Sequence, residues 1–157
     1  MTGSGNDFVM LDGRHTTPND WSPADIQAVC ARGTGVGADG LVFVSPEPAP
    51  DTVRMTYFNS DGSHAAMCGN AALCSTWLAA RLGLANAAGM VLETDAGTYR
   101  SRCTPAQHRA ELLLAPVGAP AAVAGLATVA GEQRAVLATV GVPHLVVLVA
   151  DVDQVDV

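Results

Sequence analysis

The sequence contains no lysine and few aromatic side chains. All 8 of its basic residues are arginines, and 15 acidic residues outnumber them, so the formal net charge is -7. Because a negative surface repels phosphate backbones, this composition argues against nucleic acid as a partner.

Long hydrophobic runs are also missing. The longest apolar stretches, such as Leu145–Ala150, are too short to span a bilayer. The N-terminal residues lack the basic and apolar pattern of a signal peptide. We therefore expect a cytoplasmic protein with no membrane partner. Apolar residues make up 49% of the 157 residues, which is enough to build a core.

The four cysteines form no C-x-x-C pair, and they do not gather with histidines at zinc spacings, so we expect no metal. In an intracellular chain, free thiols are the ordinary state. Cys30 and Cys103 fit small buried thiols. Cys68 has a different setting.

Apolar periodicity and turn residues indicate an α+β fold. One helix is expected after the cap residue Ser22, and a second, apolar on nearly every side, from Met67 to the closing Gly83. Residues 115–131 read as an irregular connection. Strands are expected at 8–11, 41–44, 53–57, 90–94, 97–103, 110–114, 133–140 and 145–149. The predicted fold is a mostly antiparallel sheet wrapped around one central helix.

The turn-rich segment 59–70 leads directly into the second helix and places Cys68 at its start. There the helix dipole favours the thiolate form of Cys68, and the N–H groups of Gly69 and Asn70 can hold a carboxylate. Such an arrangement is suited to removing a proton from the carbon beside that carboxylate. The structural alternative is a buried cysteine at an ordinary helix start.

Three other polar clusters have weaker signals. Asn6 lies between glycines just ahead of a strand, where the structural alternative is a turn with the asparagine in a left-handed conformation. Asp39 ends a glycine-rich loop, where it is expected to cap local backbone N–H groups. That loop lacks the residues of a nucleotide-binding motif. His144 follows Gly141-Val-Pro, and a lone histidine is more often structural than catalytic.

Taken in order, these segments resemble the N-terminal half of diaminopimelate epimerases. The matching stretches, in single-letter form, are GNDFV (5–9), R with GVGADG (32, 35–40), FN with DGS (58–59, 61–63), MCGN (67–70), ET with AG (93–94, 96–97) and G with PH (141, 143–144). They span nearly the whole chain, and their combination is specific to this family or a near relative.

The resemblance implies two similar domains, each a barrel-like antiparallel sheet around a central helix, with residues 1–157 forming the N-terminal one. It implies inversion at the α-carbon of an amino-acid substrate, LL- or meso-diaminopimelate, between two cysteines. No pyridoxal phosphate, other organic cofactor or metal is then needed. One thiolate removes the α-proton, and a second thiol protonates the opposite face.

Residue by residue, Cys68 matches the catalytic cysteine of the family's N-terminal domain. Gly69 and Asn70 match the groups that hold the α-carboxylate, and Asn6 and Asn59 match substrate-binding asparagines. His144 matches a histidine near the reacting centre.

Three departures from the family pattern bear on which substrate the protein takes and on whether this chain holds the whole catalytic site. Leu73 stands where the family has arginine, and Val142 stands where it has an asparagine that contacts the far end of diaminopimelate. The sequence also ends near the close of the first domain. We therefore expect a second domain or a partner chain to supply the other catalytic base.

Alternatives remain open at this point. Cys74 lies about 240° around the helix from Cys68, so it is expected in the core rather than as the second base. Cys30 and Cys103 stay open as candidates for the second base. A homodimer that brings two Cys68 residues to one site is a further hypothesis. The rival functions are racemisation of another amino acid, a non-catalytic binding or assembly module that retains the fold, and a thiol hydrolase that uses Cys68 and His144.

Overall fold

The computed structural model describes residues 1–123, 132–140 and 142–155. It divides the chain into two compact units, Met1–Leu113 and Leu114–Val157. Part of the expected irregular connection, 124–131, and Gly141 of the histidine motif lie outside the described residues. No helix of the described ranges is long and apolar enough to cross a membrane.

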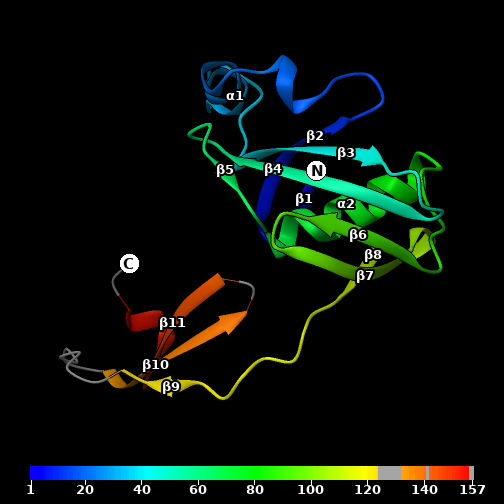
Figure 1. Cartoon of the computed structure of the whole chain (residues 1–157). Coiled ribbons are helices and arrows are strands. Elements are labelled where there is room, and N and C mark those ends of the chain that lie inside the picture. Colours follow the sequence, from blue (N-terminus) through cyan, green and yellow to red (C-terminus); the bar gives the residue numbers. More distant parts are fainter. Residues whose placement is uncertain (124–131, 141, 156–157) are drawn as a thin grey trace. The chain divides into compact units, whose positions relative to one another are not determined.

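The first unit is a curled sheet with two α-helices, which is an α+β architecture (Figure 1). The strand order is β1-β2-β3-β4-β6-β7-β8, and β5 pairs with β4. The pairings β2–β3 and β4–β6 are parallel and the others in this sheet are antiparallel. The strands are Thr2–Gly3 (β1), Asn6–Asp12 (β2), Gly40–Pro46 (β3), Thr52–Asn59 (β4), His64–Ala65 (β5), Met90–Thr94 (β6), Gly97–Thr104 (β7) and Arg109–Leu113 (β8).

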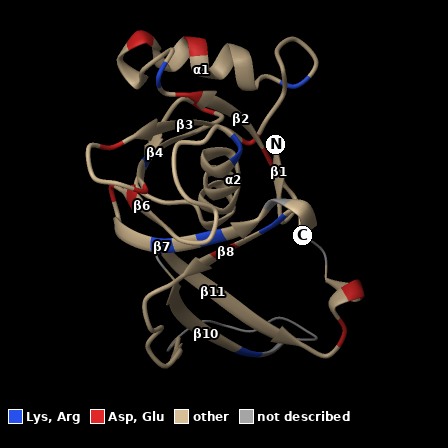
Figure 2. Ribbon diagram, turned by 90° about the vertical axis from the view of Figure 1, so that its right-hand side faces the viewer, with Lys and Arg blue, Asp and Glu red and all other residues tan. Residues whose placement is uncertain are grey.

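Helix α2, Gly69–Arg81, lies within the curl of this sheet (Figure 2). It contacts β1–β4 as well as β6–β8. Its sequence is apolar or small on most sides, and Ala71, Ala72, Cys74 and Ala79 are buried among the strands. Gly83 ends the helix with φ +68°, a conformation that glycine adopts without steric cost. The helix and its closing glycine were both predicted.

Helix α1, Pro23–Cys30, covers the opposite face of the sheet. Ser22 caps it as predicted: Ser22 Oγ accepts from the Asp25 N–H, and the Asp25 carboxylate accepts from the Ser22 N–H in return. Because helices lie on both faces, β3 is buried on both. Val42 and Val44 join the α2 core, and the alternate residues join the α1 core. This explains its continuous apolar run.

The second unit contains a three-stranded antiparallel sheet in the order β11-β10-β9. Its strands are Ala121–Ala122 (β9), Glu132–Val140 (β10) and Val142–Val149 (β11). The two long strands match the predicted ones. Single-turn 3-10 helices follow Thr17, Thr104 and Asp151.

Candidate functional site

Cys68 lies at the N-terminus of α2, as the sequence predicted. It is the N-cap residue, with extended backbone angles, and its carbonyl accepts the first helical hydrogen bond from the Ala72 N–H at 2.9 Å. Its side chain is half-buried beside the α2 core. The following residue, Gly69, is exposed, and a Cβ added there would meet nothing within 4 Å. The start of the helix is therefore open at Gly69, where an anion can approach the unpaired N–H groups of the first turn.

Three strands bring polar residues to this helix end. The parallel strands β2 and β3 pair Phe8 with Gly40, and the antiparallel strand β4 pairs Asn59 with the same Gly40. The start of β2, the start of β3 and the end of β4 therefore lie at one end of the sheet. Asn6, at the start of β2, is joined to α2 because its Oδ1 accepts a hydrogen bond from Asn70 Nδ2 at 2.6 Å.

Asn6 also contacts a carboxylate that precedes β3. Its Nδ2 donates to Asp39 Oδ2 at 3.0 Å, and the backbone N–H of Asp7 donates to the same oxygen at 3.1 Å. Asp39 was predicted to cap local backbone N–H groups, but the backbone N–H that its side chain accepts from belongs to Asp7, 32 residues away on β2. The predicted turn conformation of Asn6 is not found: the positive φ angles fall on Ser4 and Gly5, and Asn6 is already part of the strand.

An arginine joins the two acidic residues of this corner. Arg32 donates two hydrogen bonds to Asp7, at 2.7 and 3.0 Å, and one to Asp39 at 2.8 Å. Hydrogen bonds from Arg32 lower the pKa of Asp7 to about 2. The pKa of Asp39 is also lowered, first by the hydrogen bond from Asn6. Both carboxylates are therefore ionised at neutral pH.

Asn59 is held by its neighbours at the end of β4. The Tyr57 hydroxyl donates to Asn59 Oδ1 at 2.9 Å, and Asn59 Nδ2 donates to Ser63 Oγ at 3.0 Å. Burial raises the pKa of Tyr57 to about 12, and nearby acidic groups, Cys68 first among them, add to this. Gly40 has no side chain, and this leaves room for its neighbours on β4: an added Cβ would lie 2.5 Å from both the Phe58 carbonyl oxygen and the Tyr57 ring.

The loop that leads to Cys68 is attached to the β6–β7 turn. His64 Nε2 lies 2.9 Å from Asp95 Oδ2, and the Ala96 N–H donates to the Ala66 carbonyl at 3.2 Å. Asp95 also lies 3.5 Å from Arg54, which bonds two further carboxylates. Two contacts thus connect the chain just ahead of Cys68 to the rest of the sheet.

The other cysteines are buried. Cys30, Cys74 and Cys103 are 2%, 4% and 8% exposed, and burial raises the pKa of each thiol. Their predicted core positions are confirmed. His144 lies in β11 of the second unit, where it is exposed and opposite Ala138 of β10. The structure therefore gathers Cys68, Gly69, Asn70, Asn6 and Asn59 in the first unit, whereas His144 belongs to the second.

The sequence pattern alone does not reveal Tyr57 or Arg32 as site neighbours. Tyr57 reads as an inward residue of an alternating strand, and Arg32 lies 25 residues from its partner Asp7. Their only signal is the spacing of the family segments. Among the described residues, no three histidine, cysteine or acidic side chains gather in a metal-binding arrangement.

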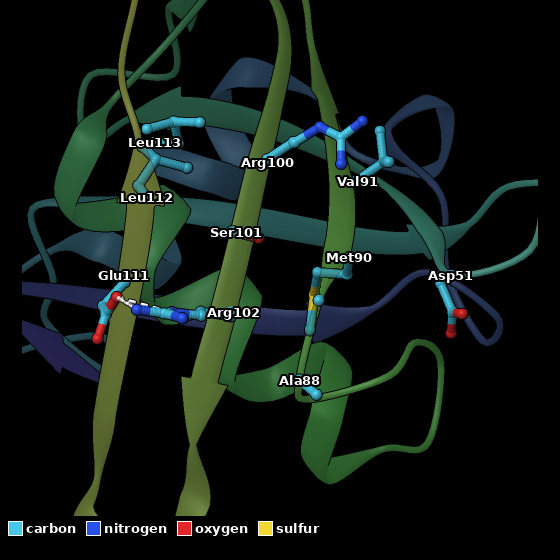
Figure 3. A pocket seen from close by; sticks show the side chains of 11 residues that line it. Asp51, Ala88, Met90, Val91, Arg100, Ser101, Arg102, Glu111, Leu112 and Leu113 are labelled. Atoms are coloured by element: carbon cyan, nitrogen blue, oxygen red, sulfur yellow. Dashed lines mark hydrogen bonds and ion pairs between the residues drawn. The ribbon is translucent and has the colours of Figure 1, made fainter.

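A groove of about 480 Å³ lies elsewhere on the first unit (Figure 3). It is lined by residues of β6, β7 and β8, by the turn before β6 and by Asp51, and two of its lining residues, Arg102 and Glu111, form an ion pair at 2.7 Å. It includes none of the predicted site residues.

The fold has solved counterparts. The chain superposes on the Bacillus anthracis phenazine biosynthesis protein of the PhzF family with a TM-score of 0.70 and 19% identity, covering 98% of this chain and 53% of that one. It also superposes on a hydroxyproline epimerase from Agrobacterium vitis with a TM-score of 0.57 and 20% identity, covering 84% of this chain and 40% of that one. The chain thus has the fold of PhzF-type and racemase-type proteins.

The sequence identifies the family to which the chain belongs among proteins of this fold. Residues 1–119 match the family model of diaminopimelate epimerase. The diaminopimelate epimerase of Gemmatimonas aurantiaca is 46% identical over 162 residues, which cover 100% of this chain and 56% of that relative. The chain belongs to the diaminopimelate epimerase family, as its motifs predicted. It spans 56% to 60% of the length of the relatives that it matches along nearly its whole sequence.

Proposed function

We propose that this chain carries one half of the site of a cofactor-independent amino-acid epimerase, with Cys68 as one of two acid–base groups. The observation that carries the proposal is the position of Cys68 at the open N-terminus of α2, next to Asn70 and its partner Asn6. Asn59 lies at the same end of the sheet. Family membership supports LL- and meso-diaminopimelate as the substrates.

In this reaction the Cys68 thiolate takes the α-proton, and the electron pair of the Cα–H bond stays on carbon. The resulting charge spreads into the α-carboxylate, which the N–H groups of Gly69 and Asn70 and the helix dipole stabilise. A second thiol then gives its proton to the opposite face of the same carbon, so the stereocentre inverts.

The second thiol is the part of the proposal that this chain does not itself supply. Cys30, Cys74 and Cys103 are buried, and so are poorly suited to meet a substrate. We propose that residues 1–157 act as the N-terminal, barrel-like and helix-centred domain of the site. A second domain, a partner chain or a second copy would provide the other base. His144, on the hairpin of the second unit, would then act near the reacting centre.

Hydrogen–deuterium exchange at the α-carbon tests the proposal. The chain is incubated in heavy water with LL- and, separately, meso-diaminopimelate, under reducing conditions. A single base should exchange deuterium into one isomer without inverting it, and Cys68→Ser should abolish the exchange while the matched variant Cys74→Ser retains it. Inversion would instead mean that the chain or its dimer supplies both bases. No exchange, even after addition of the remaining half of the Gemmatimonas aurantiaca relative, would overturn the proposal.

A racemase of another amino acid is the second candidate, and two substitutions favour it. Leu73 and Val142 replace the arginine and asparagine expected at these positions, and losing one hydrogen bond to a polar substrate costs about 1–3 kcal/mol. Exchange into an amino acid that lacks the distal ammonium and carboxylate groups, at a rate above that for diaminopimelate, would select this candidate.

A further inference from the structure

Asp39 makes hydrogen bonds through both carboxylate oxygens. Oδ2 accepts from Asn6 Nδ2 at 3.0 Å and from the Asp7 N–H at 3.1 Å, while Oδ1 accepts from Arg32 at 2.8 Å. The Asp39 N–H in turn donates to Asp7 Oδ1 at 3.1 Å, so the two backbone segments are joined in both directions. Asp39 is thereby fixed in place beside Asn6.

An ionised carboxylate can only accept hydrogen bonds, and this decides how the neighbouring amides are oriented. Because Asp39 has no proton to donate, Asn6 must turn its Nδ2 toward Asp39 and its Oδ1 the other way. That oxygen accepts from Asn70 Nδ2 at 2.6 Å, so Asn70 turns its own Nδ2 toward Asn6. If either amide were reversed, two acceptors or two donors would face each other.

The geometry points to Asp39, held by Arg32, as a positioning residue that sets the orientation of the Asn6 and Asn70 side-chain amides at the N-terminus of α2. Within this cluster, the second Nδ2 hydrogen of each amide and the Oδ1 of Asn70 are then left to bind a ligand. The inference deepens the proposed function and rests on it for its effect on the reaction.

Arg32 has a defined part in this arrangement. It neutralises two carboxylates that would otherwise repel each other across the β2–β3 corner, since Asp7 and Asp39 are both within 3.0 Å of its guanidinium. Without Arg32, the two carboxylates would repel each other, and Asp39 Oδ1 would lose the hydrogen bond that helps to hold it beside Asn6. The orientation of the Asn6 amide would then be less tightly fixed.

The first test is spectroscopic and uses the whole chain without substrate. The side-chain amide resonances of Asn6 and Asn70 are compared between the wild type, Asp39→Asn and Asp39→Ala. An amide at position 39 can donate as well as accept, and alanine can do neither, so both variants should shift the resonances of both asparagines. Asn70 is the informative one, because its hydrogen bond in this cluster is to Asn6 and not to residue 39.

Asp12→Asn is the matched control. Asp12 lies at the other end of β2 and is likewise bound by an arginine, Arg14, at 2.6 Å, but it has no contact with the site. Its variant should leave both asparagine resonances in place. Unchanged Asn70 resonances in both Asp39 variants, with the backbone spectrum still that of a folded protein, would overturn the inference.

The second test measures the rate of α-deuterium exchange into diaminopimelate. Asp39→Asn should slow it about tenfold, the effect of misplacing groups that hold the substrate, while Asp12→Asn should stay within about twofold of wild type. If the wild type shows no exchange, even after addition of the remaining half of the Gemmatimonas aurantiaca relative, the proposed function fails, whereas the resonances of Asn70 still decide the positioning by Asp39. If exchange occurs and Asp39→Asn leaves its rate unchanged, the positioning has no effect on the reaction and the inference fails.

Discussion

Cys68 differs from the other three cysteines in its position at a helix start. Turn formers followed directly by helix formers predicted that Cys68 would begin a helix, and this is a local signal that a sequence carries well. The partners of Asn6 were not predictable in the same way, since Asp39 and Asn70 lie 33 and 64 residues away. Only the folded chain brings an accepting carboxylate to one side of this amide and a donor to the other.

Alkylation should distinguish the thiols. In the native chain, iodoacetamide should modify Cys68 first, because it is half-buried at a helix N-terminus while Cys30, Cys74 and Cys103 are buried with raised pKa values. Mass spectrometry of the digested protein identifies the labelled cysteine. Modification of all four at similar rates in the folded state would contradict the burial described here.

The carboxylate of Asp7 should make stability depend on pH. Its pKa is about 2 in the folded chain against an ordinary value of 3.8, so its contribution is full above about pH 4 and is lost as the pH falls toward 2. Asp7→Asn should therefore lower the thermal unfolding midpoint at pH 7 and have a smaller effect near pH 2. A difference that stays constant between these pH values would point to lost packing instead of lost charge.

Secondary-structure elements were mostly predictable, and their pairing was not. Helix starts and stops at Ser22 and Gly83 follow from capping chemistry, and alternation predicted most of the long strands. The two-residue strands β1, β5 and β9 are too short to carry a periodic signal. The parallel pairing of β2 with β3 depends on α1 crossing between them, which a local pattern does not specify.

Gly40 gives an element-scale test, because β3 and β4 approach closely there. Gly40→Ala should clash with the Phe58 carbonyl and the Tyr57 ring and destabilise the chain by about 1–3 kcal/mol, the usual cost of overpacking. Gly89→Ala is the matched control, since an added Cβ at Gly89 meets nothing within 4 Å. Chemical denaturation measures both. Equal stability of the two variants would contradict the close approach of β4 to Gly40.

At the scale of the whole molecule, both apolar cores belong to the first unit. The residues that form them all lie before Leu113, and β8 ends at that residue. Residues 114–120 then run without regular secondary structure and are exposed. Composition predicted an irregular connection at 115–131, but it did not predict that two separate compact units divide at Leu113, because a connection within one domain has the same composition.

Limited proteolysis should cut the chain between these units. The segment 114–120 contains leucine, alanine and valine but no arginine, so elastase should cleave there early and release a stable fragment that ends near Leu113. Trypsin, which has no site between Arg109 and Arg134, provides the control. Early elastase cleavage within β2–β4 would show that the first unit is less compact than described.

The hairpin of β10 and β11 presents its apolar side chains outward. Leu137, Leu145 and Leu148 are 44%, 53% and 49% exposed, and neighbouring valines extend this surface. Water-facing leucines at this density make a protein adhere to phenyl-type resins and bind environment-sensitive dyes. The purified chain should therefore bind phenyl-type resins and such dyes despite its net charge of -7. The fragment that ends near Leu113 should no longer bind these resins and dyes, and its yield and solubility should be higher than those of the whole chain.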